Sequence, residues 1–196
     1  QSHSWRGVTC EPLDLGHDPG HISAKETPMP SHSETKRLPY TARQMYDLVA
    51  DVASYPKFLP WNSAARIRSR QAIPGGEVME ADLVISFKVF RERFGSRVTL
   101  WPEAQKIDTE YLDGPFRHMR STWAFRDIPG GCEVDFHVDF EFRNAILQGI
   151  IGVVFNDAMH RVVRAFERRA AELYGPAPLS RDGNNSRRRV GFTSKK

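Results

Sequence analysis

The polar side chains of this chain that could most readily do chemistry are Asn156, Asp157 and His160, which lie within one helical turn of one another. An imidazole next to a carboxylate could serve as a general base or as a metal ligand. Separations of three and four residues also place them on one face of a helix, where side-chain contacts along that face are the ordinary explanation. The sequence has no H-E-x-x-H, C-x-x-C, G-x-S-x-G, P-loop or G-x-G-x-x-G motif. We therefore predict no catalytic residue and no metal ligand.

The two cysteines, Cys10 and Cys132, are far apart and lie in different sequence contexts. Cys132 belongs to the apolar side of an alternating segment, so we expect a buried, unreactive thiol. A disulfide framework is not indicated, and a reducing compartment is the default.

The most distinctive apolar segment is the turn from Tyr55 to Trp61, which reads YPKFLPW. Pro56 and Pro60 keep this segment out of regular helix. So much aromatic area in a turn must either be buried or bind something apolar. Lys57 lies between the aromatic residues, where it could extend toward a ligand or a lipid phosphate, or simply be a solvated charge.

The basic character of the chain comes from its last segment. The formal net charge is +4, but residues 181–196 hold six basic residues and one acid, a net +5, so the other 180 residues carry about −1. A folded surface that is nearly neutral gives no reason to expect DNA binding.

Composition divides the chain into three parts. Residues 1–30 are interrupted by prolines and lack periodicity, so we predict a disordered N-terminal extension upstream of the patterned region. Residues 31–175 form the predicted domain, and residues 176–196 a disordered basic C-terminal tail. No apolar run approaches the roughly 18 residues that span a bilayer.

Two helices are predicted within the domain. Thr41 is a plausible N-cap for a helix that runs to about Val52, after a short strand at Ser33–Tyr40. The second helix runs from about Ala145 to Tyr174 and is stopped by Gly175. Its apolar residues recur at helical spacing, with the members Leu147, Ile151, Val154, Phe155, Ala158, Val162, Ala165, Phe166 and Leu173.

Between the helices, apolar and polar residues alternate, which is typical of antiparallel strands with one wet face. The clearest example is the segment 132–142. Pro-Gly-Gly sequences at 74–76 and 129–131 predict turns. One sheet with a single wet face must cover its other face, and the long C-terminal helix is the only element large enough. We therefore predict an α+β helix-grip fold, a curved antiparallel sheet wrapped around that helix, with an apolar cavity between them.

Four segments of this pattern carry a family resemblance: Leu48–Trp61, Gly114–Phe116, Trp123–Phe125 and Phe166–Ala170. They resemble the coenzyme Q-binding START-domain family of the polyketide cyclase/START-like superfamily, which includes bacterial ribosome-association toxins. The resemblance covers about residues 31–175 and implies a START/Bet v 1-like helix-grip fold. It implies a protein that is not an enzyme, holds ubiquinone or a similar polyprenyl lipid, and supports respiratory electron transport. It also implies a bacterial cytoplasmic location and leaves open peripheral contact with the inner membrane. The alternative that it implies is a toxin that binds the large ribosomal subunit and blocks subunit joining.

A polyprenyl quinone needs a long apolar slot and a few donors for its ring carbonyls. Ordinary core packing could also explain each apolar residue. We expect Lys57 as the polar residue at the cavity mouth and the following residues on the wall: Tyr55, Phe58, Leu59, Trp61, Leu83, Ile85, Phe87, Val98, Leu100, Phe116, Trp123, Leu147, Ile151, Val154 and Phe155.

Charged residues on the wet face favour a solvated surface. The acidic residues of 133–141 can pair across strands with Arg117, Arg120 and Arg126. A basic half made of Arg66, Arg68, Arg70, Arg91, Arg93 and Arg97 is the best argument for contact with ribosomal RNA. It lacks an RNA-reading aromatic motif. A cyclase/aromatase-type enzyme on this fold would need an acid or base in the cavity, where the expected residues are nearly all hydrocarbon.

Overall fold

The structure, a computed structural model, describes residues 31–87 and 90–175, without the side chains of residues 87, 90, 147 and 150–154. The predicted N-terminal extension and basic C-terminal tail lie outside the described residues. The elements follow the order β1 (Ser31–Leu38), α1 (Ala42–Ala50), the 3-10 helix η1 (Val52–Lys57), β2 (Asn62–Ile73), β3 (Gly76–Phe87), β4 (Phe90–Trp101), β5 (Lys106–Asp113), β6 (Phe116–Ile128), β7 (Gly131–Phe142) and α2 (Ala145–Tyr174).

The strands form one antiparallel sheet in the order β1-β7-β6-β5-β4-β3-β2. Strands β2 to β7 follow one another as hairpins, and β1 pairs with the free edge of β7. Both predicted Pro-Gly-Gly turns are confirmed, with φ of 78° at Gly75 and 85° at Gly130, a region that glycine adopts at little cost. At Gly131 an added Cβ would lie 2.0 Å from the carbonyl oxygen of Leu38, so the turn and the end of β1 are in close contact.

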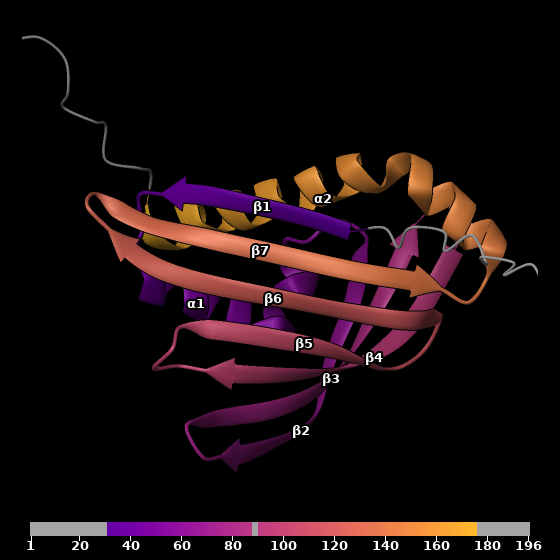
Figure 1. Cartoon of the computed structure of the whole chain (residues 1–196), viewed down its shortest axis with the longest axis horizontal. Coiled ribbons are helices and arrows are strands. Elements are labelled where there is room, and N and C mark those ends of the chain that lie inside the picture. Colours follow the sequence, from indigo (N-terminus) through magenta and orange to yellow (C-terminus); the bar gives the residue numbers. More distant parts are fainter. Residues whose placement is uncertain (1–30, 88–89, 176–196) are drawn as a thin grey trace, which may run out of the picture.

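The predicted helix-grip architecture is confirmed. The sheet curves so that its β2–β4 half turns behind its β5–β7 half, and α2 lies along the inner side (Figure 1). Helix α1 and η1 close one end of the space between the sheet and α2. This arrangement follows from the alternation, because the apolar face of each strand can be shielded from water only on the inner side.

Helix α1 begins where the sequence predicts. The Thr41 hydroxyl accepts a hydrogen bond from the Gln44 backbone N–H at 3.1 Å, and the Gln44 side-chain oxygen accepts one from the Thr41 N–H at 2.9 Å. This reciprocal pair is a capping box. The strand predicted at Ser33–Tyr40 is shifted in the structure to residues 31–38. Pro39 has no N–H to give to a sheet, so the chain leaves β7 before it reaches the cap.

The predicted end of this helix near Val52 is wrong, because α1 ends at Ala50 and the chain continues as the 3-10 helix η1. Pro56 lies within η1. It offers no N–H and disfavours the α conformation at Tyr55. A short 3-10 segment tolerates this residue better than another turn of α-helix would.

The interior contains two clusters of buried apolar side chains. The predicted alternation on β7 is confirmed by burial of the side chains on its inner face, Cys132, Val134, Phe136, Val138 and Phe140. The first cluster lies beneath α1 and includes Met79, Ala81, Leu100, Ile107, Phe166 and Ala170. The second lies toward the other end of the sheet and includes Met119, Phe136, Phe140 and Phe155.

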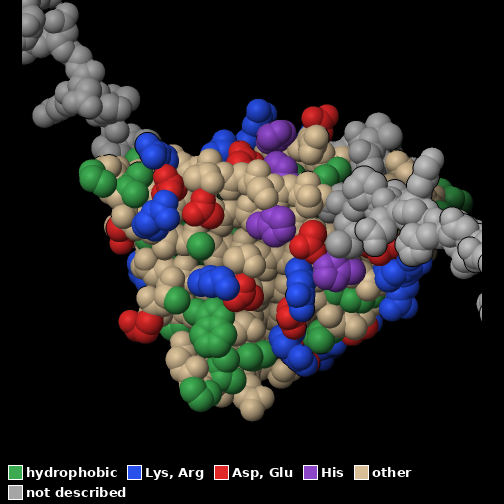
Figure 2. Space-filling model, in the orientation of Figure 1, with side chains coloured by type: hydrophobic (Ala, Val, Ile, Leu, Met, Phe, Trp, Pro, Cys, Tyr) green, Lys and Arg blue, Asp and Glu red, His purple; other side chains and the backbone are tan. Residues whose placement is uncertain are grey.

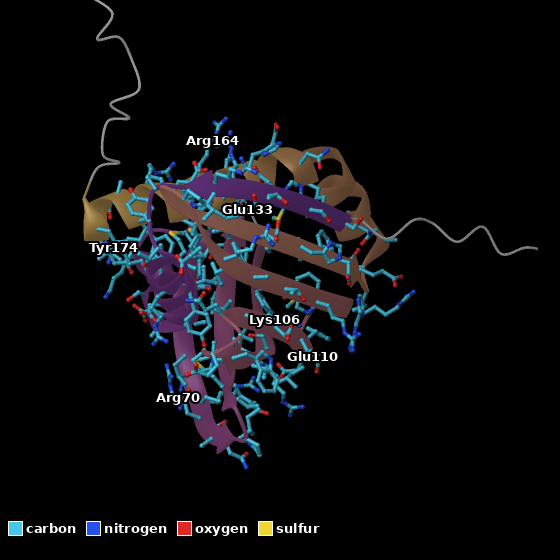
Figure 3. The ribbon with its side chains drawn as sticks, turned by 60° about the vertical axis from the view of Figure 1, so that its left-hand side comes forward. Arg70, Lys106, Glu110, Glu133, Arg164 and Tyr174 are labelled. Atoms are coloured by element: carbon cyan, nitrogen blue, oxygen red, sulfur yellow. The ribbon has the colours of Figure 1, made fainter. Side chains whose placement is uncertain are left out.

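The last two turns of α2 pack against the core through every fourth residue. Leu173, which is 48% exposed, is not one of these residues. Phe166 and Ala170 are buried, and Tyr174 continues that row, so Leu173 lies beside it. The Tyr174 hydroxyl donates to the Gln44 carbonyl oxygen at 2.9 Å and joins the end of α2 to α1 (Figure 3). The expectation that Leu173 belongs to the apolar face is therefore wrong.

Candidate ligand cavity

A cavity of about 330 Å³ lies between the inner face of the sheet, α2 and the turn after η1. Of the residues predicted to form its wall, the structure places these on it: Tyr55, Leu59, Trp61, Leu83, Ile85, Val98, Phe116, Trp123 and Phe155. They come from η1 and its turn, from β3, β4 and β6, and from α2. That they bind a ligand stays a prediction.

The aromatic turn is divided between the cavity and the core. The Tyr55 ring lies on the wall, and its hydroxyl donates to the Val49 carbonyl oxygen at 2.6 Å. Burial raises the pKa of this phenol, so it remains neutral. Phe58 does not line the cavity: its ring packs on Phe166 at 5.2 Å, with the Arg169 guanidinium 5.8 Å from it. Phe58 thus anchors the turn, while Leu59 and Trp61 face the cavity.

Two further predictions of position are corrected by the structure. Lys57 is exposed and does not line the cavity, and its Nζ lies 3.3 Å from the Ser54 hydroxyl. Leu100 is buried in the cluster beneath α1, not on the wall, because it lies near the end of β4 that packs toward that cluster. Four predicted residues have side chains outside the described part of the structure: Phe87, Leu147, Ile151 and Val154.

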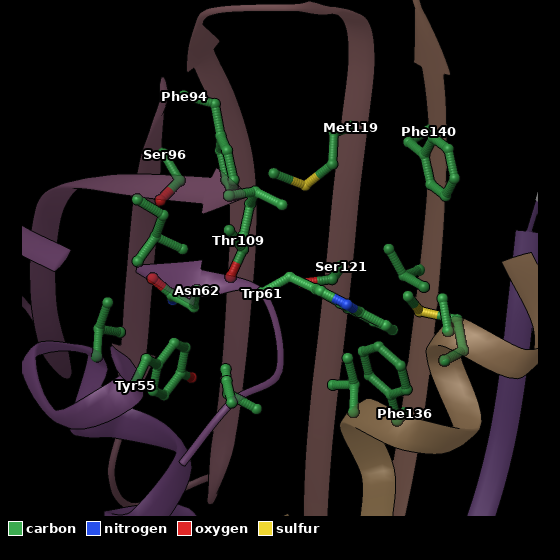
Figure 4. A pocket seen from close by; sticks show the side chains of 18 of the residues that line it. Tyr55, Trp61, Asn62, Phe94, Ser96, Thr109, Met119, Ser121, Phe136 and Phe140 are labelled. Atoms are coloured by element: carbon green, nitrogen blue, oxygen red, sulfur yellow. The ribbon is translucent and has the colours of Figure 1, made fainter. Parts of the chain in front are cut away.

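Trp61 has an unusual backbone conformation, with φ of +61°. A bulky residue adopts this left-handed region only when its surroundings hold it there. Its carbonyl oxygen accepts a hydrogen bond of 2.7 Å from the Ser86 N–H, which fixes the turn against β3. Because of this turn, Trp61 and the following Asn62 both line the cavity (Figure 4).

Several wall residues were not predicted as site residues. The apolar ones include Phe94, Met119, Phe136, Val138, Phe140 and Phe142. Their position in the alternation was the available signal, since they share a face with the residues that were named. Four polar wall residues, Asn62, Ser96, Thr109 and Ser121, were also missed. Ser121 lies in phase with Met119 and Trp123, but a hydropathy pattern gives no signal for an inward polar side chain.

The surroundings of His160 and Cys132 are those of residues that support the fold. The Nδ1 of His160 lies 3.8 Å from a Glu34 carboxylate oxygen, and its ring meets that of His32 edge-on at 5.7 Å. These contacts are with β1, so the predicted contacts along its own helix face stay a prediction. Cys132 is fully buried, as predicted, and burial raises the pKa of its thiol to about 11. Among residues 31–87 and 90–175, no three His, Cys, Asp or Glu side chains are grouped to hold a metal ion.

Four of the six arginines in the predicted basic half are paired with carboxylates, namely Arg68, Arg70, Arg93 and Arg97. Arg68 donates to Asp82 at 2.9 Å and to Asp113 at 3.0 Å, and Arg93 also contacts Asp113 at 2.7 Å. The hydrogen bond from Arg68 is the main cause of a lowered pKa at Asp82. Further along the same strands the pairing continues with Arg70–Glu77 and Arg97–Glu80. The predicted basic half is thus largely neutralised by neighbouring acids.

The predicted pairing on β6 and β7 is confirmed for Arg117 with Glu141 and for Arg126 with Glu133. Arg120 instead pairs with Glu110 of β5. Figure 2 shows side chains of both charges interleaved over the face in view. Such a surface is typical of a solvated face.

A curved antiparallel sheet closed by a long helix over an apolar cavity defines a protein of the helix-grip class. The family described as polyketide cyclase / dehydrase and lipid transport matches residues 38–167. This chain belongs to that family. No helix in the described part of the chain combines the length and the apolarity that crossing a membrane requires.

Three similar proteins illustrate the range of the family. The ribosome association toxin RatA of Rickettsia prowazekii is 39% identical over 74% of this chain and 99% of its own length. The mitochondrial coenzyme Q-binding protein COQ10 homolog B of Xenopus laevis is 33% identical over 74% of this chain and 59% of its own length. The solution structure of the 18 kDa protein CC1736 from Caulobacter crescentus superimposes with a TM-score of 0.65 at 33% identity, covering 76% of this chain and all of that one.

Proposed function

We propose that this protein binds a polyprenyl quinone, such as ubiquinone, in the cavity between the sheet and α2. The observation that carries the proposal is a cavity of about 330 Å³ whose wall is apolar except for a small group of neutral polar side chains. This combination suits a quinone, whose ring carries oxygen atoms and whose tail is hydrocarbon. The relative named as a coenzyme Q-binding protein supports the choice of ligand.

The size of the cavity sets how much of the lipid it holds. Its volume is near the lower end of the roughly 300–1,000 Å³ that ligand sites occupy. The ring and the first prenyl units therefore fit inside, and the rest of a long tail must pass out. We propose that a membrane shields the outer part of the tail, which would place the protein at the inner surface of the bacterial membrane for part of its time.

Binding is favoured over catalysis by the chemistry of the wall. None of the wall residues in the described part of the chain is Asp, Glu, His, Lys or Arg. Tyr55, the one phenol among these wall residues, has a raised pKa, and its hydroxyl donates a hydrogen bond to a backbone oxygen. A cyclase or aromatase would need a general acid or base in reach of its substrate. We therefore propose a binding protein whose ligand leaves chemically unchanged.

The test measures binding of decylubiquinone to the purified full chain by quenching of tryptophan fluorescence, since Trp61 and Trp123 both line the cavity. The variant Leu83→Gln places a polar amide on the wall and should weaken binding at least tenfold. The matched control is Leu173→Gln, the same change at an exposed site on α2. Equal affinity of the two variants, or no saturable binding by the native chain, would refute the proposal.

Ribosome association is a second candidate, favoured by the relative from Rickettsia prowazekii that matches this chain over 99% of its own length. The test is co-sedimentation of the protein with large ribosomal subunits over a range of salt concentrations. Contact through phosphates predicts binding that falls steeply with salt. The paired state of the arginines on β2–β4 predicts weak binding through that face. Absence of the protein from the subunit fractions at low salt would remove this candidate.

A further inference from the structure

Asn62 is a buried polar side chain with no partner inside the described structure. It is the first residue of β2, lines the cavity and is only 6% exposed. Neither its Nδ2 nor its Oδ1 has a hydrogen-bond partner among the described residues. Buried amides are nearly always hydrogen-bonded, because an unpaired one loses its contact with water without compensation. This amide is therefore suited to meet a polar group of a bound ligand.

Three hydroxyl groups on consecutive strands line the same cavity. Thr109 of β5 and Ser121 of β6 are directly opposite each other in register. Ser96 of β4 is 1% exposed and donates to the Ala81 carbonyl oxygen at 3.4 Å, so toward the cavity its oxygen can only accept. Figure 4 shows these side chains and Asn62 on the wall of one pocket. The cavity thus has a polar subsite with both donors and acceptors.

We propose that Asn62 is a specificity-determining residue that makes the cavity prefer a ligand ring carrying a hydroxyl over one carrying only carbonyls. For a quinone lipid, this means that the reduced quinol binds more tightly than the oxidised quinone. The inference rests on the proposed function and adds the redox form of the ligand. A quinol hydroxyl can donate to the Asn62 Oδ1 and accept from its Nδ2 at once. A quinone carbonyl can only accept, which leaves the Oδ1 unpaired.

The size of the preference follows from that one unpaired acceptor. Quinol and quinone have the same tail and nearly the same ring, so their apolar contacts cancel in the comparison. Leaving one buried acceptor unpaired corresponds to a loss of about tenfold in affinity. Tighter binding of the reduced form raises the midpoint potential of the bound couple, by about 30 mV for a tenfold ratio and two electrons.

The experiment compares decylubiquinol and decylubiquinone binding to the full chain under anaerobic conditions, with tryptophan fluorescence as the readout. The test variant is Asn62→Leu, which keeps the side-chain size and removes both hydrogen-bonding atoms. The control is Asn156→Leu, the same change at an exposed position of α2. We expect a ratio of dissociation constants of about ten for the native chain and for the control, and a ratio below two for Asn62→Leu.

The outcomes distinguish failure of the redox preference from failure of quinone binding itself. If the native chain binds both forms equally, the redox preference is overturned and quinone binding stands. If Asn62→Leu keeps the tenfold ratio, the assignment to Asn62 is overturned. If neither form binds the native chain, quinone binding and this inference fall together. Should Asn62→Leu fail to fold, as judged by circular dichroism, Asn62→Ala takes its place, and a tenfold ratio kept by that variant overturns the assignment to Asn62.

Discussion

Met79 and Leu83 lie on the same strand and the same face of β3, but only one of them belongs to the cavity. Met79 is fully buried in the cluster beneath α1. Leu83 is partly exposed and lines the cavity. Truncating each to alanine therefore tests whether the two ends of this strand differ in role as the structure indicates.

The expected costs differ because the surroundings differ. Met79→Ala leaves a hole in a fully packed region and should destabilise the protein by about 2–5 kcal/mol. Leu83 already faces empty space on one side, so its truncation loses only about half of the roughly 2 kcal/mol that full burial of a leucine provides, or about 1 kcal/mol. For ligand binding the order is reversed. Leu83→Ala removes about 1 kcal/mol of contact with a bound lipid, roughly fivefold in Kd, and Met79→Ala removes none.

Urea unfolding at 25 °C measures the first quantity, with equal m-values as the sign that only stability has changed. Fluorescence titration with decylubiquinone measures the second. We expect Met79→Ala to be the more strongly destabilised variant with an unchanged Kd, and Leu83→Ala to lose only about 1 kcal/mol of stability while its Kd rises about fivefold. If Leu83→Ala proves as destabilising as Met79→Ala and leaves Kd unchanged, Leu83 is an ordinary core residue and the space beside it is not a ligand site.

Two further predictions concern the scaffold. Gly131→Ala should destabilise the protein by about 1–3 kcal/mol in the urea assay, since the new Cβ would meet the Leu38 carbonyl oxygen. Gly149→Ala, in the same assay, should stabilise it by about 0.5–1 kcal/mol, because this glycine lies in a helix and nothing is near the new Cβ. Arg68→Met should reduce stability near pH 6, and its difference from the native chain should shrink as the pH falls below about 3.9. The pKa of Asp82 is lowered in the folded state, so the pair stabilises above the unfolded carboxyl pKa of about 3.9 and is lost as pH falls through the folded value. A stability difference that stays constant from pH 6 to pH 2 would contradict this account.

The fold could be predicted because its signals are periodic and local. The alternation on β7 identified the inner face, and the capping signal placed Thr41 at the start of α1. Glu133 shows the limit of the same rule: it is on the outer face, yet it is only 8% exposed. Arg37 and Arg126 both pair with its carboxylate and cover it. Pairing between side chains on neighbouring strands depends on register, which the pattern of a single strand does not contain.

The apolar part of the cavity wall was partly predictable for the same reason, but the polar part was not. The position of Asn62 depends on the left-handed turn at Trp61, and no sequence signal marks that turn, since glycine or asparagine is the usual residue there. Phe58 and Leu59 are adjacent and both pack against the buried cluster, yet only Leu59 also lines the cavity. That choice is made by the 3-10 helix η1, which ends at Lys57 and sets the direction of the residues that follow.

The buried amide of Asn62 should also lower the stability of the protein when no ligand is bound. An amide buried without partners costs about 1–3 kcal/mol, so Asn62→Leu should stabilise the ligand-free protein by an amount in that range. Residues kept for binding at the expense of stability behave in this way, whereas residues kept for the fold do not. Urea unfolding of lipid-free protein, with Asn156→Leu as the control, measures the difference. If Asn62→Leu is less stable than the native chain, ordered water already forms hydrogen bonds with the Asn62 amide. The unpaired amide is then no evidence for a polar group of a ligand.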